Sequence, residues 1–166
     1  MLGLTPLGTI HTLVGLVAVL AGIVALFRDK AISPRNGVGR LYIVTTVITC
    51  LTAFGIFQHG GFGKGHLLAI LTLLMLGVAA VAGYTRLFGK LSTYIETVSY
   101  SMTFLFHWIP AITESSIRLP PSAPLVESVD SPRLQVVAAV LFILFVIGAT
   151  LQVRRMRKLG GRTTAT

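Results

Sequence analysis

The feature that most constrains this chain is a series of five long apolar stretches that contain almost no charge. They cover residues 5–27, 40–59, 65–85, 91–111 and 134–153. A helix needs about 20 apolar residues to cross the roughly 30 Å hydrocarbon core of a bilayer, and each stretch meets that length. Only 11% of the residues are charged, against about 25% in soluble domains. The sequence therefore predicts an all-α integral membrane protein with five transmembrane helices, forming a single transmembrane domain over residues 1–166.

Lysine and arginine residues are distributed unevenly between the loops that join these stretches. Most fall in the first loop, the third loop and the C-terminal tail, residues 154–166. They are Arg28, Lys30, Arg35, Arg40, Arg86, Lys90, Arg154, Arg155, Arg157, Lys158 and Arg162. The opposite side has only Lys64, Arg118 and Arg133. By the positive-inside rule the tail is cytoplasmic and the N-terminus lies outside. Topology and anionic lipid head groups explain the net charge of +9, so a nucleic-acid partner is not expected.

All four histidines are predicted to lie in the outer half of the membrane. A helix rises about 1.5 Å per residue, which places His11 and His107 about 24 Å above the cytoplasmic ends of their helices. His59 and His66 come out at about 27 to 30 Å. The four residues belong to four different helices. We therefore expect them to converge in one layer of a four-helix bundle.

Polar or small residues recur on single faces of the first, second and fourth helices. The stripe of the fourth helix consists of Glu96, Tyr100, Thr103, His107 and Glu114. The stripe of the second consists of Thr45, Thr49, Thr52 and His59. In the first helix, Gly8, Gly15 and Gly22 lie seven residues apart on the side of His11. The stretch 134–153 has no such stripe, so we expect it to pack outside a bundle of the other four.

The histidine layer predicts a bound cofactor. Imidazole is the commonest metal ligand, and histidines from different helices can hold haem iron in a membrane bundle. Gly8 and Gly15 flank His11 and leave room for a porphyrin edge, and His11 and His107 are the expected axial pair of haem b. His59 and His66, nearer water, can take propionates or a second ligand, or shuttle protons. If a bare transition metal ion (Zn, Cu or Fe) is bound instead, the expected ligands are His11, His59, His66, His107 and Glu114.

Each of these residues also has a simpler interpretation. A histidine at the interface can be an ordinary polar residue at the water boundary, and a glycine heptad is commonly a helix-packing device. Glu96 is close to the end of its helix, where it can reach water or pair with Arg86 or Lys90. The aromatic residues expected as interfacial anchors are Tyr42, Tyr84 and Trp108.

Motifs of nucleotide-using or hydrolytic enzymes are not found in the sequence. It contains no Walker loop, Rossmann glycine pattern, Cys-x-x-Cys, His-Glu-x-x-His or nucleophile elbow. The run at 60–65, Gly-Gly-Phe-Gly-Lys-Gly, resembles a phosphate loop by its glycines alone, and its place between two spans predicts a tight outer turn. Whether the protein is an enzyme stays open at this point.

Two segments resemble an uncharacterised family of small bacterial inner-membrane proteins of unknown function. They are 34–42, Pro-Arg-Asn-Gly-Val-Gly-Arg-Leu-Tyr, and 62–69, Phe-Gly-Lys-Gly-His-Leu-Leu-Ala. The region around His11 and the region 100–119 are similar too. The resemblance implies a bacterial plasma membrane and a helical bundle. Many relatives have a histidine before the Gly-Arg-Leu-Tyr sequence where this chain has Arg35, which removes a cytoplasmic-side ligand and disfavours a two-haem arrangement.

Three functions fit these patterns. The leading hypothesis is electron transfer through haem b or a transition metal held by the outer-leaflet histidines, with a membrane redox partner or a quinone. The second is a proton or small-solute channel or transporter-like protein that uses the polar stripe of the fourth helix. The third is an accessory subunit of a larger membrane complex, in which the stripe only fixes helix packing. A Soret band in the purified protein separates the first hypothesis from the other two.

Overall fold

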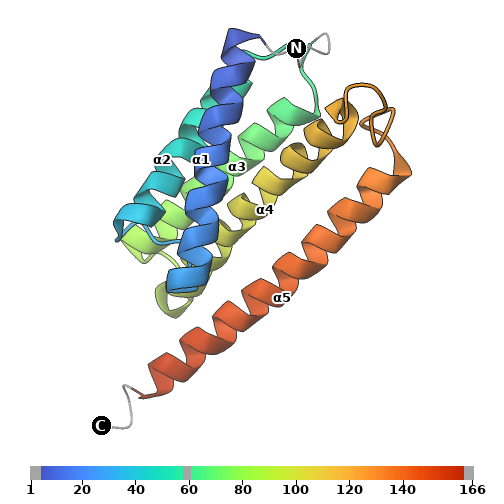
Figure 1. The fold of residues 1–166 in the computed structure, drawn as a ribbon. Helices are drawn as coiled ribbons and strands as arrows, with labels where there is room; N and C mark the ends of the chain where they lie inside the picture. Colours follow the sequence, from blue (N-terminus) through green and yellow to red (C-terminus); the bar gives the residue numbers. More distant parts are fainter. Residues whose placement is uncertain (1–4, 58–60, 163–166) are drawn as a thin grey trace.

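The computed structural model describes residues 5–57 and 61–162, and every regular element in these ranges is helical (Figure 1). The elements are α1 (Pro6–Asp29), α2 (Gly37–Ala53), α3 (Lys64–Thr85), the short 3-10 helix η1 (Gly89–Leu91), α4 (Ser92–Arg118) and α5 (Pro132–Arg162). The expectation of an all-helical chain with five α-helices is confirmed. Three of these helices, α1, α3 and α5 up to Leu159, are long and apolar enough to cross a membrane.

The second helix ends earlier than the sequence predicts. The apolar stretch 40–59 suggested one continuous span, whereas α2 covers Gly37–Ala53. Beyond Ala53 the backbone tightens into a turn, in which Gly55 N donates to Thr52 O at 3.1 Å and Ile56 N donates to Ala53 O at 3.1 Å. Bonds between residues three apart replace the helical pattern and end the helix.

The fourth and fifth helices are longer than predicted. α4 was expected to end near residue 111 but continues to Arg118, where Glu114 and Arg118 form an ion pair one turn apart. It ends because the next residue, Leu119, precedes a proline and takes the extended conformation. α5 starts at Pro132, a favourable first helical position, and continues to Arg162. Most of the basic segment 154–166, expected as a tail, is therefore helical.

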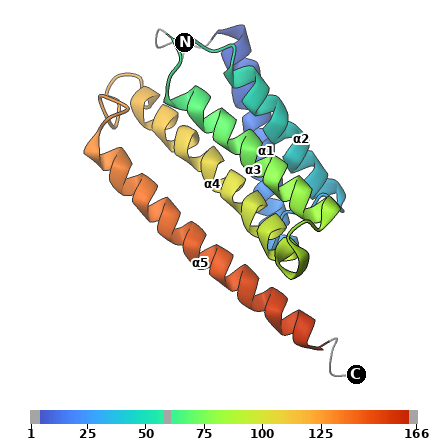
Figure 2. The ribbon, with the colours of Figure 1, turned by 180° about the vertical axis from the view of Figure 1, so that it is seen from behind.

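Helices α1 to α4 form a bundle, and α5 lies outside it. α1 packs mainly against α2 and α3 mainly against α4, while α4 also contacts α1 and α5. Both views show α5 running beside α4, with its last turns extending beyond the ends of the other helices (Figures 1 and 2). This arrangement agrees with the predicted peripheral position of the fifth helix. α4 is thus the bundle helix against which α5 packs.

The bundle is apolar outside and partly polar inside. Large apolar side chains such as Leu20, Phe27 and Leu74 are exposed at 61%, 77% and 60%. Many of the buried residues are instead small or polar. They include Ala18, Ala21, Ala25, Ala79, Ala82, Thr45, Thr46, Thr49, Thr103, Glu96 and His107. Small residues let helix backbones approach closely in a bilayer, where burying large apolar groups between helices gives no net advantage over contact with lipid. The distribution is compatible with a location in a membrane.

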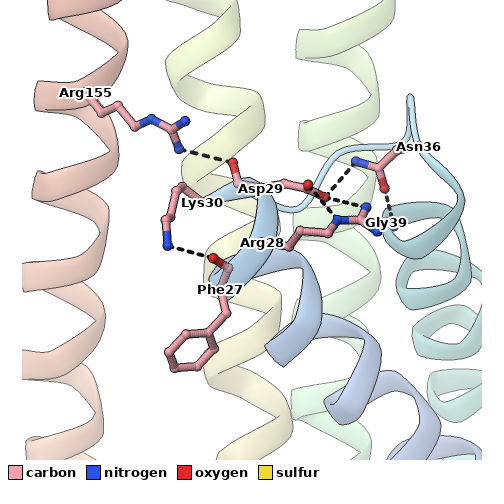
Figure 3. Close-up of polar contacts among 7 residues, drawn as sticks. All are labelled: Phe27, Arg28, Asp29, Lys30, Asn36, Gly39 and Arg155. Carbon is pink, nitrogen blue, oxygen red and sulfur yellow. Dashed lines mark hydrogen bonds and ion pairs between the residues drawn. The ribbon is translucent and has the colours of Figure 1, made fainter.

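The loop between α1 and α2 is held tightly by its own polar groups (Figure 3). Lys30 caps α1 in the left-handed conformation at φ 63°. Asn36 caps α2, because its Oδ1 accepts from Gly39 N at 2.8 Å, and its Nδ2 donates to Asp29 Oδ2 at 3.1 Å. A Cβ atom at Gly39 would lie only 2.7 Å from the carbonyl carbon of Ser33, so the first turn of α2 presses directly on the loop backbone. These contacts fix the position of the intervening residues.

Candidate functional site

A line of polar side chains runs through the interface of α1, α2 and α4. We call it the polar seam. Its members are His11, Tyr42, Thr46, Thr49, Thr52, Thr103 and His107. The α2 residues follow helical spacing, so they share the face that packs against α1 and α4. The seam therefore brings together ionisable groups from three helices inside the bundle.

The hydrogen bond between His107 and Thr46 determines which ring nitrogen of His107 carries the proton. Its Nε2 lies 2.9 Å from Thr46 Oγ1, and that hydroxyl donates its only hydrogen to Tyr42 O at 2.7 Å. Thr46 Oγ1 can then only accept, so a neutral His107 carries its proton on Nε2. The lone pair on Nδ1 makes no hydrogen bond within the described residues. His107 is 9% exposed, so its ring lies inside the bundle.

His11 faces the same helix from the other side. Its Nδ1 lies 3.1 Å from both Thr49 O and Thr52 Oγ1. A carbonyl oxygen can only accept, so Nδ1 carries the proton and Nε2 keeps a free lone pair. The partners of His11 and His107 fall within two turns of α2. Both histidines are therefore hydrogen-bonded to the threonine-rich face of α2.

Tyr42 completes the seam between the two helices. Its hydroxyl lies 2.8 Å from Thr103 Oγ1, which itself donates to Tyr100 O at 2.7 Å. Tyr42 therefore donates to Thr103. The edge of its ring also meets His107, with ring centroids 5.8 Å apart. Tyr42 is fully buried, so its expected role as an interfacial anchor is wrong.

His66 lies in a different environment from His11 and His107. It is in the first turn of α3, where its Nδ1 accepts from Gly63 N at 3.1 Å. The ring stacks between Phe57 and Phe62, with centroids 5.0 and 5.1 Å away. Because Nδ1 accepts a hydrogen bond, a neutral His66 carries its proton on Nε2 and offers no lone pair to a metal ion. Its described contacts are local to the start of α3 and the turn before it.

Glu96 forms an ion pair that the sequence did not indicate. Arg35 Nη1 lies 2.7 Å from Glu96 Oε1, and Arg35 Nη2 donates to Gly83 O at 3.3 Å. The Glu96 side chain is 8% exposed and that of Arg35 is 60% exposed. The hydrogen bond to Glu96 raises the pKa of Arg35, so the guanidinium remains charged. The expected partners Arg86 and Lys90 are not the ones that the carboxylate uses.

Gly83 makes this ion pair possible. A Cβ atom on Gly83 would lie 2.6 Å from Glu96 Cδ, so any larger residue would displace the carboxylate. The side chain of Glu96 thus passes over the backbone of α3 to reach the loop that contains Arg35. At the end of the bundle where α1 and α2 are joined, the polar face of α4 therefore ends in the Arg35–Glu96 ion pair, in which the two charges neutralise each other.

The remaining predicted site residues have other partners. Glu114 is paired with Arg118 Nε at 2.8 Å. Gly8 lies in the first turn of α1, where its N–H donates to the cap residue Thr5. A Cβ on Gly15 would meet the side chain of Thr49 at 3.6 Å, so this glycine faces α2. The prediction for His59 lies outside the described residues.

The cofactor hypotheses can be tested against these positions. Within residues 5–57 and 61–162, no three His, Cys, Asp or Glu side chains lie close enough together to share a metal ion. His11 does fit as a single ligand, because a metal-binding histidine commonly donates its other N–H to a backbone carbonyl. His107 is held in the same way, because its Nε2–H donates to Thr46 while its Nδ1 makes no hydrogen bond within the described residues. Each of the two rings therefore has one ring nitrogen suited to a ligand role.

Sequence reasoning missed Thr46, Tyr42 and Arg35. Thr46 lies outside the stripe of the second helix that the spacing suggested, yet it is the partner of His107. Its neighbours at 42 and 49, one turn away on either side, were the only signal that could have identified it. Comparison of the sequence with protein-family profiles, with curated proteins and with solved structures gave no match. The resemblance of segments 34–42 and 62–69 to a bacterial membrane family therefore stays a prediction.

Proposed function

We propose that the protein is an integral protein of a bacterial inner membrane that moves protons, or a small solute coupled to protons, through the polar seam. α1 to α5 are then five spans, with the N-terminus outside and the C-terminus in the cytoplasm. The uneven distribution of Lys and Arg supports this orientation. α2 and α4 are less apolar than α1 and α3 because their inward faces carry most of the seam.

The observation that carries the proposal is the pair of basic nitrogens on His107 and His11. Each ring is oriented by hydrogen bonds to threonines of α2, and each keeps one lone pair without a hydrogen bond from any described residue. Ionisable residues within a membrane are costly and commonly belong to ion or proton pathways. The Tyr42 and Thr103 hydroxyls extend the polar line from His107 toward the Glu96 end of α4. In this proposal His107 accepts and releases the transferred proton.

Proton flux into liposomes tests this function. The full-length protein is reconstituted into vesicles that contain a pH-sensitive dye, and a potassium gradient with valinomycin drives proton entry. His107→Gln should lower the flux by about tenfold or more, because a positioned acid-base group contributes at least that factor. Thr103→Val should also reduce it. Thr72→Val is the matched control, since Thr72 is a buried threonine of α3 whose hydroxyl donates to Leu68 O.

Two results would contradict the proposal. The proposal is wrong if vesicles with the wild-type protein are no more permeable to protons than empty vesicles. It is also wrong if the His107→Gln variant has the same proton flux as the wild type. A folded protein without flux and without colour would instead support an accessory subunit whose seam fixes helix packing.

Electron transfer through haem b or a transition metal is the second candidate. The favourable observation is His11, whose Nδ1 is held by a carbonyl oxygen while Nε2 stays available. An optical spectrum and metal analysis of the purified protein test it. His11→Ala should abolish a Soret band or the bound metal, whereas colourless, metal-free wild-type protein would exclude this candidate.

A further inference from the structure

The end of α1 and the basic end of α5 meet through side chains only. No Cα atom of α1 lies within 8 Å of a Cα atom of α5 in the described chain. The connection is made by Gln152 Nε2, which donates to Lys30 O at 3.0 Å, and by Arg155 Nη1, which donates to Asp29 O at 3.2 Å. Figure 3 shows Arg155 and Lys30 extending from the two helices in front of α4. Two cations are thereby brought to the same place from distant parts of the sequence.

These two cations have no carboxylate partner among the described residues. Lys30 Nζ donates to Phe27 O at 2.6 Å, and Arg155 binds another carbonyl. The carboxylate of Asp29 is occupied by Arg28, at 2.8 and 2.9 Å, and by Asn36. The C-terminal end of a helix offers a partial negative charge of only about one half. The site therefore has excess positive charge.

An apolar surface lies directly beside this charge. Phe27 is one turn before Lys30, and its ring is 77% exposed. Figure 3 shows the ring next to Lys30, on the side toward the body of the helices. A positive end and an adjacent exposed aromatic ring match an amphiphile with an anionic head and an apolar chain.

We propose that Lys30, Arg155 and Phe27 bind an anionic phospholipid of the adjoining leaflet. The lipid phosphate lies between the two cations, and the first part of an acyl chain lies on Phe27. The lipid bridges α1 and α5, which the protein itself connects only through side chains. This inference does not depend on the proposed proton transfer.

The left-handed conformation of Lys30 offers a clean way to remove its charge. Glycine adopts this conformation more easily than any other residue, so Lys30→Gly removes the ammonium group and its bond to Phe27 O while keeping the backbone conformation of the cap. Arg86 supplies the matched control, because it caps α3 in the same conformation at φ 54°. Arg86→Gly removes one positive charge in the same structural context, at the end of α3, which makes no backbone contact with α5 in the described chain. Arg155→Gln removes the second cation of the proposed site.

Lipid binding is measured on the full-length protein in detergent by native mass spectrometry. Phosphatidylglycerol is titrated against phosphatidylcholine of the same chain length. The wild type should prefer phosphatidylglycerol, and Lys30→Gly and Arg155→Gln should each lower that affinity by about fivefold, which corresponds to about 1 kcal/mol for each cation. Arg86→Gly should leave the affinity unchanged.

Three outcomes would overturn the proposal. Equal losses in Lys30→Gly and Arg86→Gly would mean a general effect of basic charge instead of a site. If the wild type showed no preference for phosphatidylglycerol, the site would not select an anionic head group. Displacement of the lipid by millimolar inorganic phosphate would show that the site binds free phosphate and that Phe27 contributes nothing. Retention of secondary structure in each variant, measured by circular dichroism, is required for the comparison.

Discussion

Replacement of Gly39 by alanine, in the first turn of α2, should strongly destabilise the protein. A Cβ at this position would lie 2.7 Å from the carbonyl carbon of Ser33 and 2.8 Å from Ser33 N. Both are backbone atoms, so no side-chain rotation can relieve the clash. Either the loop or the first turn of α2 has to move.

The size of the effect follows from three terms. Overpacking costs about 1–3 kcal/mol, and the upper end applies here because backbone must shift. The shift also separates Gly39 N from Asn36 Oδ1, now 2.8 Å apart, and loss of such a cap costs about 1 kcal/mol. The greater helix propensity of alanine offsets up to about 1 kcal/mol. The net loss is about 3 kcal/mol, which lowers the melting temperature by about 6–12 °C for a chain of this size.

Gly37→Ala is the control. Gly37 is two residues earlier in the same helix, and a Cβ there has no neighbour within 4 Å. Its melting temperature should equal that of the wild type or exceed it slightly. Thermal unfolding in detergent, followed by circular dichroism, gives both values. Equal melting temperatures for the two alanine variants would refute the argument from close approach.

Four further substitutions test individual contacts by the same melting assay. Gly22→Ala should cost about 1–3 kcal/mol, because its Cβ would lie 2.6 Å from the ring of Phe104, and Phe104→Leu in the same chain should restore part of the loss; an unimproved double variant would place the strain elsewhere. Asn36→Ala should cost about 1 kcal/mol through loss of the α2 cap, and no change would show that the cap is dispensable. Arg35→Ala should destabilise the protein by about 2 kcal/mol, because it leaves the buried Glu96 carboxylate unpaired. This value is lower than the cost of breaking a fully buried pair, because Arg35 is exposed to solvent. Glu96→Gln should cost less than about 1 kcal/mol because Arg35 can reach water, and the opposite order would contradict the assigned burial.

The number and approximate positions of the helices could be predicted because each depends on a local property, the length of an apolar stretch. The ends could not, because they depend on hydrogen bonds and conformations that hydropathy does not contain. α2 begins at Gly37, three residues before the apolar stretch, since Asn36 supplies its cap. This early start moves Tyr42 into the second turn of the helix, where it is buried. A tyrosine close to a basic loop therefore looked interfacial in the sequence although it belongs to the seam.

The histidines illustrate the same division. Depth along a helix follows from counting residues, and His11, His66 and His107 do occur in the expected parts of their helices. The direction of each side chain depends on which helix packs beside it, and that is a property of the whole bundle. His11 and His107 meet the threonines of α2, whereas His66 meets Phe57, which follows α2, and Phe62, which precedes its own helix. Equal depth was therefore not enough to predict one shared site.

Glu96 shows what a sequence requires without revealing how the requirement is met. A carboxylate in an apolar bundle needs a cationic partner, because an unpaired buried charge is strongly destabilising. Nearness in the sequence favoured Arg86 and Lys90, but the actual partner, Arg35, is 61 residues away. The loop of Arg35 is set by the close approach of Gly39 to Ser33, and the path to Glu96 is open because Gly83 has no side chain. Two glycines and an arginine from separate segments thus make this ion pair possible. Considered singly in the sequence, each glycine looks like a flexible residue and the arginine looks like a cation that only sets membrane topology.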